Sequence, residues 1–173
     1  MSYYITSKGN KIDIDNSSET KLDLTYKDII ELNVSDCINL KELDCYNNKL
    51  TQLDLSSNIN LEYLSCHNNK LNELDISNCV NLKYLYCYNN QLTCLDLSKN
   101  INLITLYCHN NQLTQLDISK CIELKHLNCR NNNLTQLDIS KCIKLEYLLC
   151  DIKTNIINIH QYINNENIRI NQI

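Results

Sequence analysis

The chain has almost none of the residues that usually make tight turns, because only one of its 173 residues is glycine and none is proline. Asparagine is abundant instead, with 29 copies. Asparagine tolerates the left-handed backbone conformation and bonds to nearby backbone groups, so it can replace glycine and proline in turns. Asparagine-rich chains are often disordered. Here the asparagines and leucines recur at fixed offsets, which excludes a low-complexity segment.

Long apolar runs and clusters of one charge are also missing. The formal net charge is −4, and acidic and basic residues are interspersed. This pattern argues against nucleic acid and against a membrane surface as partners. No stretch has the length of a signal peptide or of a transmembrane helix. The sequence therefore predicts a single domain that stays inside the cell, in the cytoplasm of its own or of a host cell.

The short motifs of common active sites are absent as well. The chain contains no CxxC pair, no HExxH, no phosphate-binding loop and no GxSxG. Cys66 and His67 are adjacent, so they point to opposite faces of a strand and cannot form a catalytic pair. We therefore expect neither an enzyme nor a cofactor.

Eleven cysteines would suggest a disulfide framework in a small secreted protein. The count is odd, however, and no export signal accompanies it. We expect reduced thiols that fill buried positions as small apolar groups. Adjacent coils about 4.8 Å apart would still bring thiols within bridging reach under strong oxidation.

A strict period of 21 residues runs through most of the chain. It is clearest in the cysteines Cys45, Cys66, Cys87, Cys108, Cys129 and Cys150. Five Asn-Asn pairs keep the same step, beginning at Asn47-Asn48. A fixed period of this length indicates a stack of similar coils, each in contact only with its neighbours.

Each unit contains one pattern twice, as in LKELDCYNNKLTQLDLSSNIN from Leu40 to Asn60. The Leu-x-Cys and Leu-x-Leu alternation is typical of short strands with one buried face. Ten or eleven residues per half-coil are too few for a strand plus a full helix. We therefore predict a mainly β, right-handed solenoid with two parallel sheets and little or no helix.

The pattern LxxLxCxxNxLxxLDLSxNxx resembles the leucine-rich repeat signature, in the nested 21-residue class called IRREKO repeats. That resemblance covers roughly Ile29 to Cys150. Repeats of this class occur in giant DNA viruses and bacteria. The resemblance implies a non-enzymatic module that binds a protein, which could then be a host protein.

The alternation also predicts the buried positions. Leucines and cysteines of the first half-coil fill one side of the core, and Leu53, Leu55 and their copies fill the other. Asn48 and its copies should form a buried ladder, and losing one should cost about 1–3 kcal/mol. A second ladder alternates residue type along Cys37, Asn58, Cys79, Asn100, Cys121 and Cys142.

The two ends of such a stack need caps. Residues 1–28 contain a predicted hairpin and a degenerate turn, and we expect them to form the N-terminal cap. Residues 29–150 hold the repeats, as five full units with half units at both ends. After Cys150 the register slips, and residues 151–173 are expected to form the C-terminal cap.

One exposed strand face is rich in aromatic side chains. We call it the Tyr/His face, and it comprises Tyr46, Tyr63, Tyr84, Tyr86, Tyr88, Tyr107, Tyr147, His67, His109 and His126. The corresponding positions of the other side carry Gln, Asp, Ser, Thr and Lys. Such rings give large contact areas with few rotatable bonds, which favours a protein-binding face. The alternative is that the tyrosines only pair across strands, for about 0.2–1 kcal/mol each.

Two further features could carry chemistry. A column of aspartates, Asp54, Asp75, Asp96, Asp117 and Asp138, could hold cations or could bond to local Ser, Thr or backbone N–H groups. The glycine-rich turns of calcium-binding β-rolls are missing, so we expect no metal. Cys94 stands where other units carry Gln or Glu, and it should be exposed.

The sequence alone favours partner binding through the Tyr/His face by a monomer. The competing hypothesis is a structural protein that associates with copies of itself.

Overall fold

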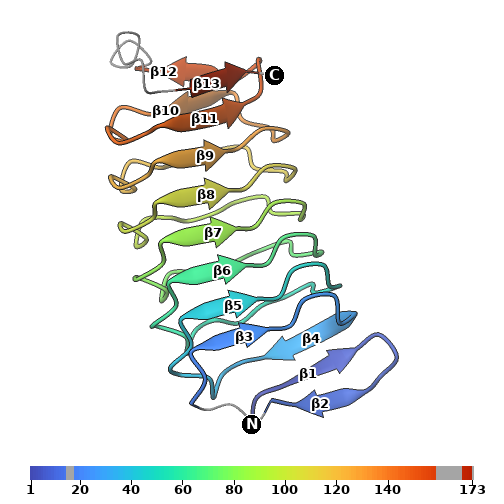
Figure 1. Cartoon of the computed structure of the whole chain (residues 1–173). Coiled ribbons are helices and arrows are strands. Elements are labelled where there is room, and N and C mark those ends of the chain that lie inside the picture. The colour runs from blue at the N-terminus through green and yellow to red at the C-terminus, as the bar shows by residue number, and fades with distance from the viewer. Residues whose placement is uncertain (15–17, 159–168, 173) are drawn as a thin grey trace.

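The computed structural model describes residues 1–14, 18–158 and 169–172. Within these ranges the chain forms thirteen short strands and no helix. Figure 1 shows the strands stacked as successive rungs of one elongated solenoid, with the two termini at opposite ends. The prediction of a mainly β stack of 21-residue coils is therefore confirmed.

Eight strands form one parallel sheet along the whole stack, in the order β13-β11-β9-β8-β7-β6-β5-β3. Their bounds are β3 Lys21–Asp23, β5 Glu42–Asp44, β6 Tyr63–Ser65, β7 Tyr84–Tyr86, β8 Thr105–Tyr107, β9 His126–Asn128, β11 Tyr147–Cys150 and β13 Arg169–Gln172. From β3 to β11 each residue pairs with the residue 21 positions away, as Leu43 does with Leu64. Because every coil has the same length, identical side chains line up in columns across the sheet.

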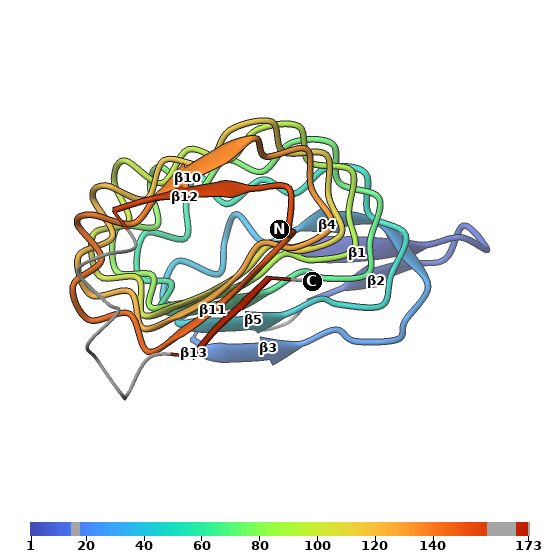
Figure 2. The same cartoon turned by 90° about the horizontal axis from the view of Figure 1, so that it is seen from above.

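The core is one continuous column of aliphatic and thiol side chains inside the coils. Leu43, Leu64, Cys45 and Cys66 have no solvent-exposed area, and their copies in the next coils are equally buried. Figure 2, a view along the stack, shows the coils enclosing this space. Ten of the eleven cysteines are buried free thiols, as predicted.

The second parallel sheet, on the opposite side of the coils, is short. Among the described residues it consists of β10 Gln136–Asp138 paired with β12 Asn155–Ile157, and Asn33 and Asp54 add an isolated bridge. The aspartate of each coil on this side accepts the serine N–H two residues later, whether or not its strand pairs. Leu53, Leu74 and Leu95 on this side keep 7–8% of their surface exposed.

Asparagine ladders hold the coils together at the end of the parallel strands. The Asn90 amide nitrogen donates to the carbonyls of Cys66 and Cys87, both at 3.1 Å. Its amide oxygen accepts the Leu71 N–H at 3.0 Å. The same bonds recur at Asn48, Asn69, Asn111 and Asn132, so the predicted ladder is confirmed.

An exposed ladder of asparagine side chains lies beside the buried one. Asn68 donates to the Asn47 side chain at 2.6 Å, and Asn89, Asn110 and Asn131 repeat the bond. These residues have φ between 52° and 54°, the left-handed conformation that glycine usually supplies. The Asn-Asn pair thus combines a turn residue with a ladder residue.

At the N-terminal end, β1 Tyr3–Thr6 and β2 Lys11–Asp13 form an antiparallel hairpin. Its turn contains Gly9, which has φ +82°. Strand β1 also pairs antiparallel with β4 Ile29–Asn33, so it occupies the edge that β4 would otherwise leave open. That residues 1–28 act as a cap remains a prediction.

At the C-terminal end, β12 and β13 continue the two sides of the coil. The Asp151 carboxylate accepts the backbone N–H groups of Asn131 and Asn132, and so replaces the backbone carbonyls that accept the equivalent N–H groups in earlier coils. Part of the predicted C-terminal cap, residues 159–168 and 173, lies outside the described residues. Among those described, no helix is long and apolar enough to cross a membrane.

Candidate partner-binding face

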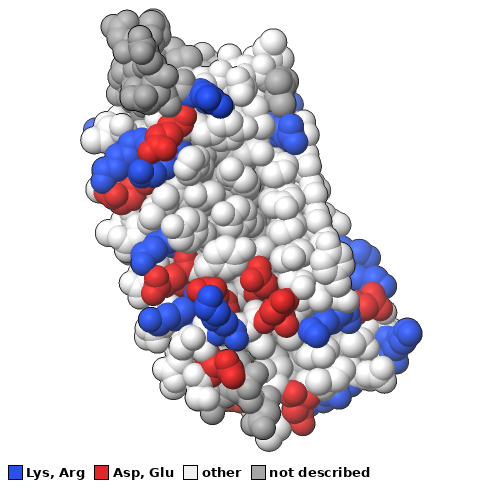
Figure 3. Space-filling model, in the orientation of Figure 1, with Lys and Arg blue, Asp and Glu red and all other residues white. Residues whose placement is uncertain are grey.

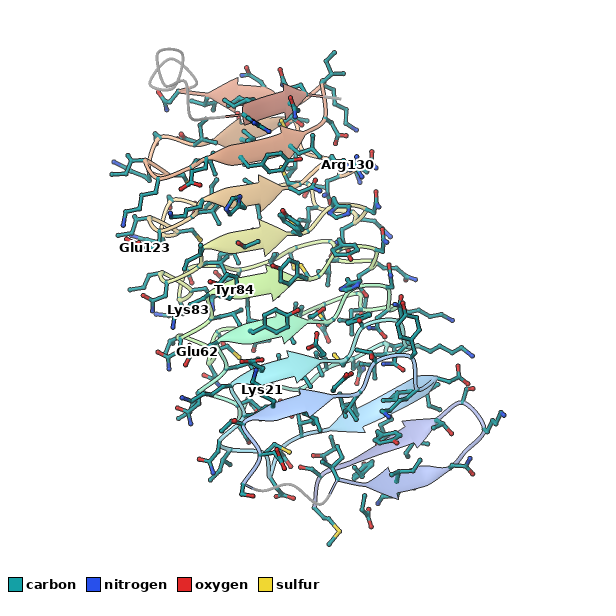
Figure 4. The ribbon with its side chains drawn as sticks, viewed as in Figure 1. Lys21, Glu62, Lys83, Tyr84, Glu123 and Arg130 are labelled. Carbon is teal, nitrogen blue, oxygen red and sulfur yellow. The ribbon has the colours of Figure 1, made fainter. Side chains whose placement is uncertain are left out.

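The parallel sheet presents three side-chain columns of the Tyr/His face to solvent. Two come from the ends of each strand, and the third follows the strand at the turn. Figure 4 shows Tyr84 in the middle of this face and Arg130 beside the turns where the strands end. Most of the rings are half-buried, and Tyr84 is the most open of those on the strands, at 38%.

The turn column is a face-to-face stack of alternating tyrosine and histidine rings. The ring centroids are 4.4 Å apart for Tyr46 and His67, 4.2 Å for His67 and Tyr88, and 4.4 Å for Tyr88 and His109. The ring planes of these pairs are tilted by 16° or less. The stack is continuous because the 21-residue period places these four rings directly above one another.

The strand columns add four more rings. The ring centroid of Tyr63 lies 6.4 Å from that of Tyr84 and 5.6 Å from that of Tyr86. The rings of Tyr86 and Tyr107 meet edge-on, with 5.4 Å between their centroids. Tyr107 also contacts His109 at 6.3 Å, which joins the two sets. Eight of the ten predicted residues therefore form one surface of rings in contact.

His126 and Tyr147 lie apart from that surface. They are neighbours across β9 and β11, but the buried Thr105 stands between Tyr84 and His126 in their column. Within the described ranges no ring contact joins either residue to the other eight. We therefore expect the centre of any binding site to lie over β6 to β8.

Burial sets the protonation of this face. It lowers the pKa of His67 and of His109 from 6.5 to about 4, assisted at His67 by His109 and at His109 by Arg130. Burial also raises the pKa of Tyr63 to about 12. At neutral pH the rings of His67, His109 and Tyr63 are therefore uncharged, and the Tyr63 hydroxyl remains a donor.

A shallow depression of about 500 Å³ lies where Ser65 replaces a ring. It is lined by Tyr26, Tyr46, Asn47, Tyr63, Ser65, His67, Asn68, Tyr86 and Tyr88. Sequence reasoning missed Tyr26, which is 74% exposed and meets Tyr46 edge-on at 5.7 Å. The available signal was the 21-residue period: Tyr26 precedes Asn47 by 21 residues, and both have the left-handed backbone conformation.

Charge is distributed unequally along the face. Figure 3 shows no charged side chains over β7 and β8, whereas acidic and basic side chains lie over β3 and β5, where Lys21 pairs with Glu42 at 2.7 Å. Asp44 at the end of β5 is half-buried, and burial raises its pKa. Arg130 lies at the other end of the stack, and no hydrogen bond reaches its buried Nε from the part of the chain that is described.

Ser65 and His67 form the one contact on the face that resembles a catalytic pair, with 3.0 Å between Ser65 Oγ and His67 Nδ1. Ser65 is only 1% exposed, and the lowered pKa makes His67 a weak base at neutral pH. The contact therefore fixes the ring and does not activate the hydroxyl.

The aspartate column bonds locally. In each of the five coils an aspartate Oδ1 accepts the backbone N–H of the serine two residues later, at 2.8–2.9 Å. This bond lowers the pKa of each carboxyl, for example that of Asp75. Across the described positions no three His, Cys, Asp or Glu side chains are grouped to hold a metal ion.

Cys94 is exposed, as predicted, in an open groove of about 580 Å³ beside Leu53 and Leu74. Burial raises the pKa of the Cys66 and Cys108 thiols in the core to about 12. A thiol-specific chromogenic disulfide should therefore modify one thiol rapidly in the folded protein and all eleven after denaturation. Replacing Cys94 by serine should remove the rapid phase, and a rapid phase that persists would contradict the predicted burial.

Comparison with known proteins agrees with this architecture. The family described as Leucine Rich repeats (2 copies) matches residues 59–100, 80–121 and 101–142. No curated protein matches the chain.

Several solved structures share the fold. A leucine-rich repeat protein of Leptospira interrogans superposes with a TM-score of 0.76 at 24% identity, covering 87% of this chain and 42% of that one. For the internalin InlF of Listeria monocytogenes the TM-score is 0.71 at 18% identity, covering 96% and 58%. For internalin C2 of the same species the TM-score is 0.68 at 18% identity, covering 97% and 87%. The chain thus spans about half the length of the first two.

Proposed function

Because this chain is a leucine-rich repeat protein, we propose that it binds a protein partner through its Tyr/His face and has no catalytic role. Proteins of this class typically mediate protein–protein interaction. The observation that supports the choice of face is the surface of eight rings in contact over β6 to β8. The opposite side of the coils carries exposed polar residues such as Gln52, Glu73 and Gln115 at the equivalent positions.

Preorganisation makes these rings suitable for binding. Tyrosine is among the residues that contribute most to interface energies, and a ring held by its neighbours loses little freedom on binding. Tyr46, His67, Tyr88 and His109 are already fixed by stacking at 4.2–4.4 Å. A partner would therefore meet a rigid surface. The entropy cost of ordering these side chains arises when the chain folds and not when the partner binds.

Charge suggests how the partner is oriented. The depression at Ser65 lies beside the acidic end of the face, where Asp44 follows Leu43 on β5. We expect a basic side chain of the partner there, close to the tyrosine rings and to the carboxylate. An acidic group of the partner would complement Arg130 at the far end.

The test compares capture of partners from a lysate by two triple variants and the native chain. The face variant carries Tyr84→Ser, Tyr86→Ser and Tyr107→Ser. The matched control carries Glu73→Ser, Gln115→Ser and Gln136→Ser, three exposed positions on the opposite side. All three proteins must first show the same circular dichroism spectrum and melting curve.

A partner captured by the native chain and the control, and lost by the face variant, is the expected result. Losing these three central rings should weaken binding at least a hundredfold, since a hot-spot residue contributes about 2 kcal/mol or more. If all three proteins capture the same set, the rings only stabilise the sheet and the proposal fails. A Tyr63→Phe variant then separates hydroxyl contacts from ring contacts in the confirmed complex.

A further inference from the structure

A column of exposed aliphatic side chains runs along the stack at the turn that precedes each parallel strand. We call it the aliphatic ridge, and it consists of Ile38, Ile59, Val80, Ile101, Ile122 and Ile143. Their side chains are between 45% and 72% exposed. Six of the twelve large exposed hydrophobic residues in the described chain belong to this one column. Scattered apolar residues are ordinary on a surface, but a contiguous line marks an interaction site.

The ridge is held rigidly. Asn60 donates to the Ile38 carbonyl at 3.0 Å, Asn81 to the Ile59 carbonyl at 3.2 Å, and Asn102 to the Val80 carbonyl at 3.1 Å. These bonds tie the first three ridge residues to the next coil. In Figure 4 the ridge edge is marked by Glu123, the chain neighbour of Ile122, opposite the edge that carries Arg130. The ridge is therefore separate from the turn column of the Tyr/His face.

We propose that the aliphatic ridge is the contact surface of a homodimer, in which two copies of this chain lie antiparallel. The spacing of the ridge residues follows the coil repeat of about 4.8 Å, and a second copy has the same spacing by construction. A two-fold axis perpendicular to the ridge would place Val80 against Ile101 of the other copy. It would likewise place Ile59 against Ile122 and Ile38 against Ile143, so every ridge residue would meet another.

Charges beside the ridge favour the antiparallel arrangement. The column two residues before the ridge runs from Asp36 through Ser57 and Asn78 to Lys99, Lys120 and Lys141. Antiparallel pairing sets Lys99 opposite Asn78, Lys120 opposite Ser57 and Lys141 opposite Asp36, with no two like charges facing. Parallel pairing about an axis along the ridge would instead gather Lys99, Lys120 and Lys141 of both copies at one end of the interface. There Lys141 would face Lys144, and Lys120 would face Glu123, which already pairs with Lys144 at 2.6 Å. This concentration of lysines at one end disfavours the parallel arrangement.

The size of the ridge predicts a weak dimer. Five steps of about 4.8 Å give a length of about 24 Å, which corresponds to a buried area on the order of 500 Å² per copy. Stable interfaces bury about 800 Å² per partner, so we expect dissociation in the micromolar range. Because a two-fold contact uses the same patch on both copies, association should stop at the dimer.

Sedimentation velocity from about 1 to 300 μM tests the proposal, since this range spans micromolar dissociation constants. Native protein should shift from monomer to dimer across it. Ile101→Lys, which places two charges at the centre of the contact, should raise the dissociation constant at least tenfold. Ile122→Lys serves as a second variant should the first fail to fold. Ile30→Lys, at an exposed isoleucine of β4 outside the ridge, should leave the dimer unchanged.

A pair of substitutions at Ser57 tests the orientation. Ser57 is part-exposed, and it would face Lys120 of the other copy only in the antiparallel dimer. Ser57→Asp should therefore tighten the dimer about threefold through two new rim ion pairs, and Ser57→Lys should weaken it by a similar factor. Asp36 is less suitable, because it already pairs with the Met1 amino group at 2.6 Å.

Three results would overturn the proposal: a monomer at every concentration, a dimer indifferent to Ile101→Lys, or open-ended oligomers. Open-ended growth would point to contacts between the ends of the stack. Lipid vesicles that bind the native chain but not Ile101→Lys, without any dimer, would show that a membrane covers the ridge instead. The Tyr84→Ser, Tyr86→Ser, Tyr107→Ser variant should dimerise normally, so failure of the proposed partner-binding function would leave this result intact.

Discussion

Replacing Asn90 by cysteine should lower the free energy of unfolding by about 3 kcal/mol, since three buried backbone groups lose their partner at about 1 kcal/mol each. Those groups are the carbonyls of Cys66 and Cys87 and the N–H of Leu71. All belong to coils in the middle of the stack. Because each coil is stabilised by its neighbours, a weakened central interface should also make unfolding less cooperative. Urea denaturation followed by circular dichroism measures both effects.

The same substitution at Asn100 provides a matched control. Asn100 is equally buried in the second ladder and donates to the carbonyls of Ile76 and Cys79. Its amide oxygen, however, has no hydrogen-bond partner in the described residues. Cysteine already occupies this ladder position in neighbouring coils, as at Cys79 and Cys121. Asn100→Cys should therefore cost about 1 kcal/mol or less. Equal losses at the two positions would show that the asparagines contribute by volume and not by their bonds.

The repeat made the strand side of the coil predictable in detail. A period without insertions leaves one possible register, so the pairing of Leu43 with Leu64 and the burial of the cysteine column followed directly. The other side was not predictable in the same way. Its Leu-x-Leu alternation matches a strand in every coil, yet among the described residues only β10 and β12 pair as strands there. Side-chain patterning therefore identified which residues are buried but not whether their backbones pair.

For the candidate site, the sequence predicted which residues share a column but not how their rings contact one another. Alternation placed ten rings on one face, but the stacking of Tyr46 on His67 depends on ring orientation, which a sequence does not specify. The isolation of His126 depends on Thr105, one small residue in the column between two larger ones. The aliphatic ridge repeats as regularly as the leucines do. It was missed because regular spacing by itself does not distinguish an exposed isoleucine from a buried one.

The two proposed surfaces meet different physical requirements. The Tyr/His face is uncharged over β7 and β8 and is bounded by Asp44 and Arg130. It therefore suits a partner that is recognised through contacts with the rings and through complementary charge. The aliphatic ridge contains no aromatic ring and repeats identically from coil to coil, which suits a partner with the same repeat. Since the two lie on different edges of the coil, a dimer would present two Tyr/His faces at once. Bivalent presentation can raise apparent affinity for a clustered partner by about a hundredfold or more.

Acidification should destabilise the folded chain through the ring stack. The folded pKa of His67 and of His109 is about 4, below the ordinary value of 6.5, so the unfolded chain binds more protons between these values. The stabilisation is fully present above about pH 6.5 and is lost as the pH falls through about 4. Both rings are only half-buried, so solvent screening limits the expected loss to about 1–2 kcal/mol per histidine.

The double variant His67→Tyr, His109→Tyr isolates this contribution, because tyrosine can continue the stack without titrating in the window. Other groups respond in different directions: burial raises the pKa of Asp44, whereas the serine N–H lowers that of Asp75. The difference between native protein and double variant removes these shared terms. Free energies of unfolding are measured in urea at about pH 7.5, 5.5 and 4.5 for both proteins. On acidification the value for the native protein should fall toward that of the double variant, because the native protein loses the stabilisation by its neutral histidines. Tyr88→Phe, which keeps both histidines, should retain the native slope. Parallel pH profiles for native protein and double variant would mean that the imidazoles titrate in the fold as they do in water, and hence that the stack opens readily to solvent.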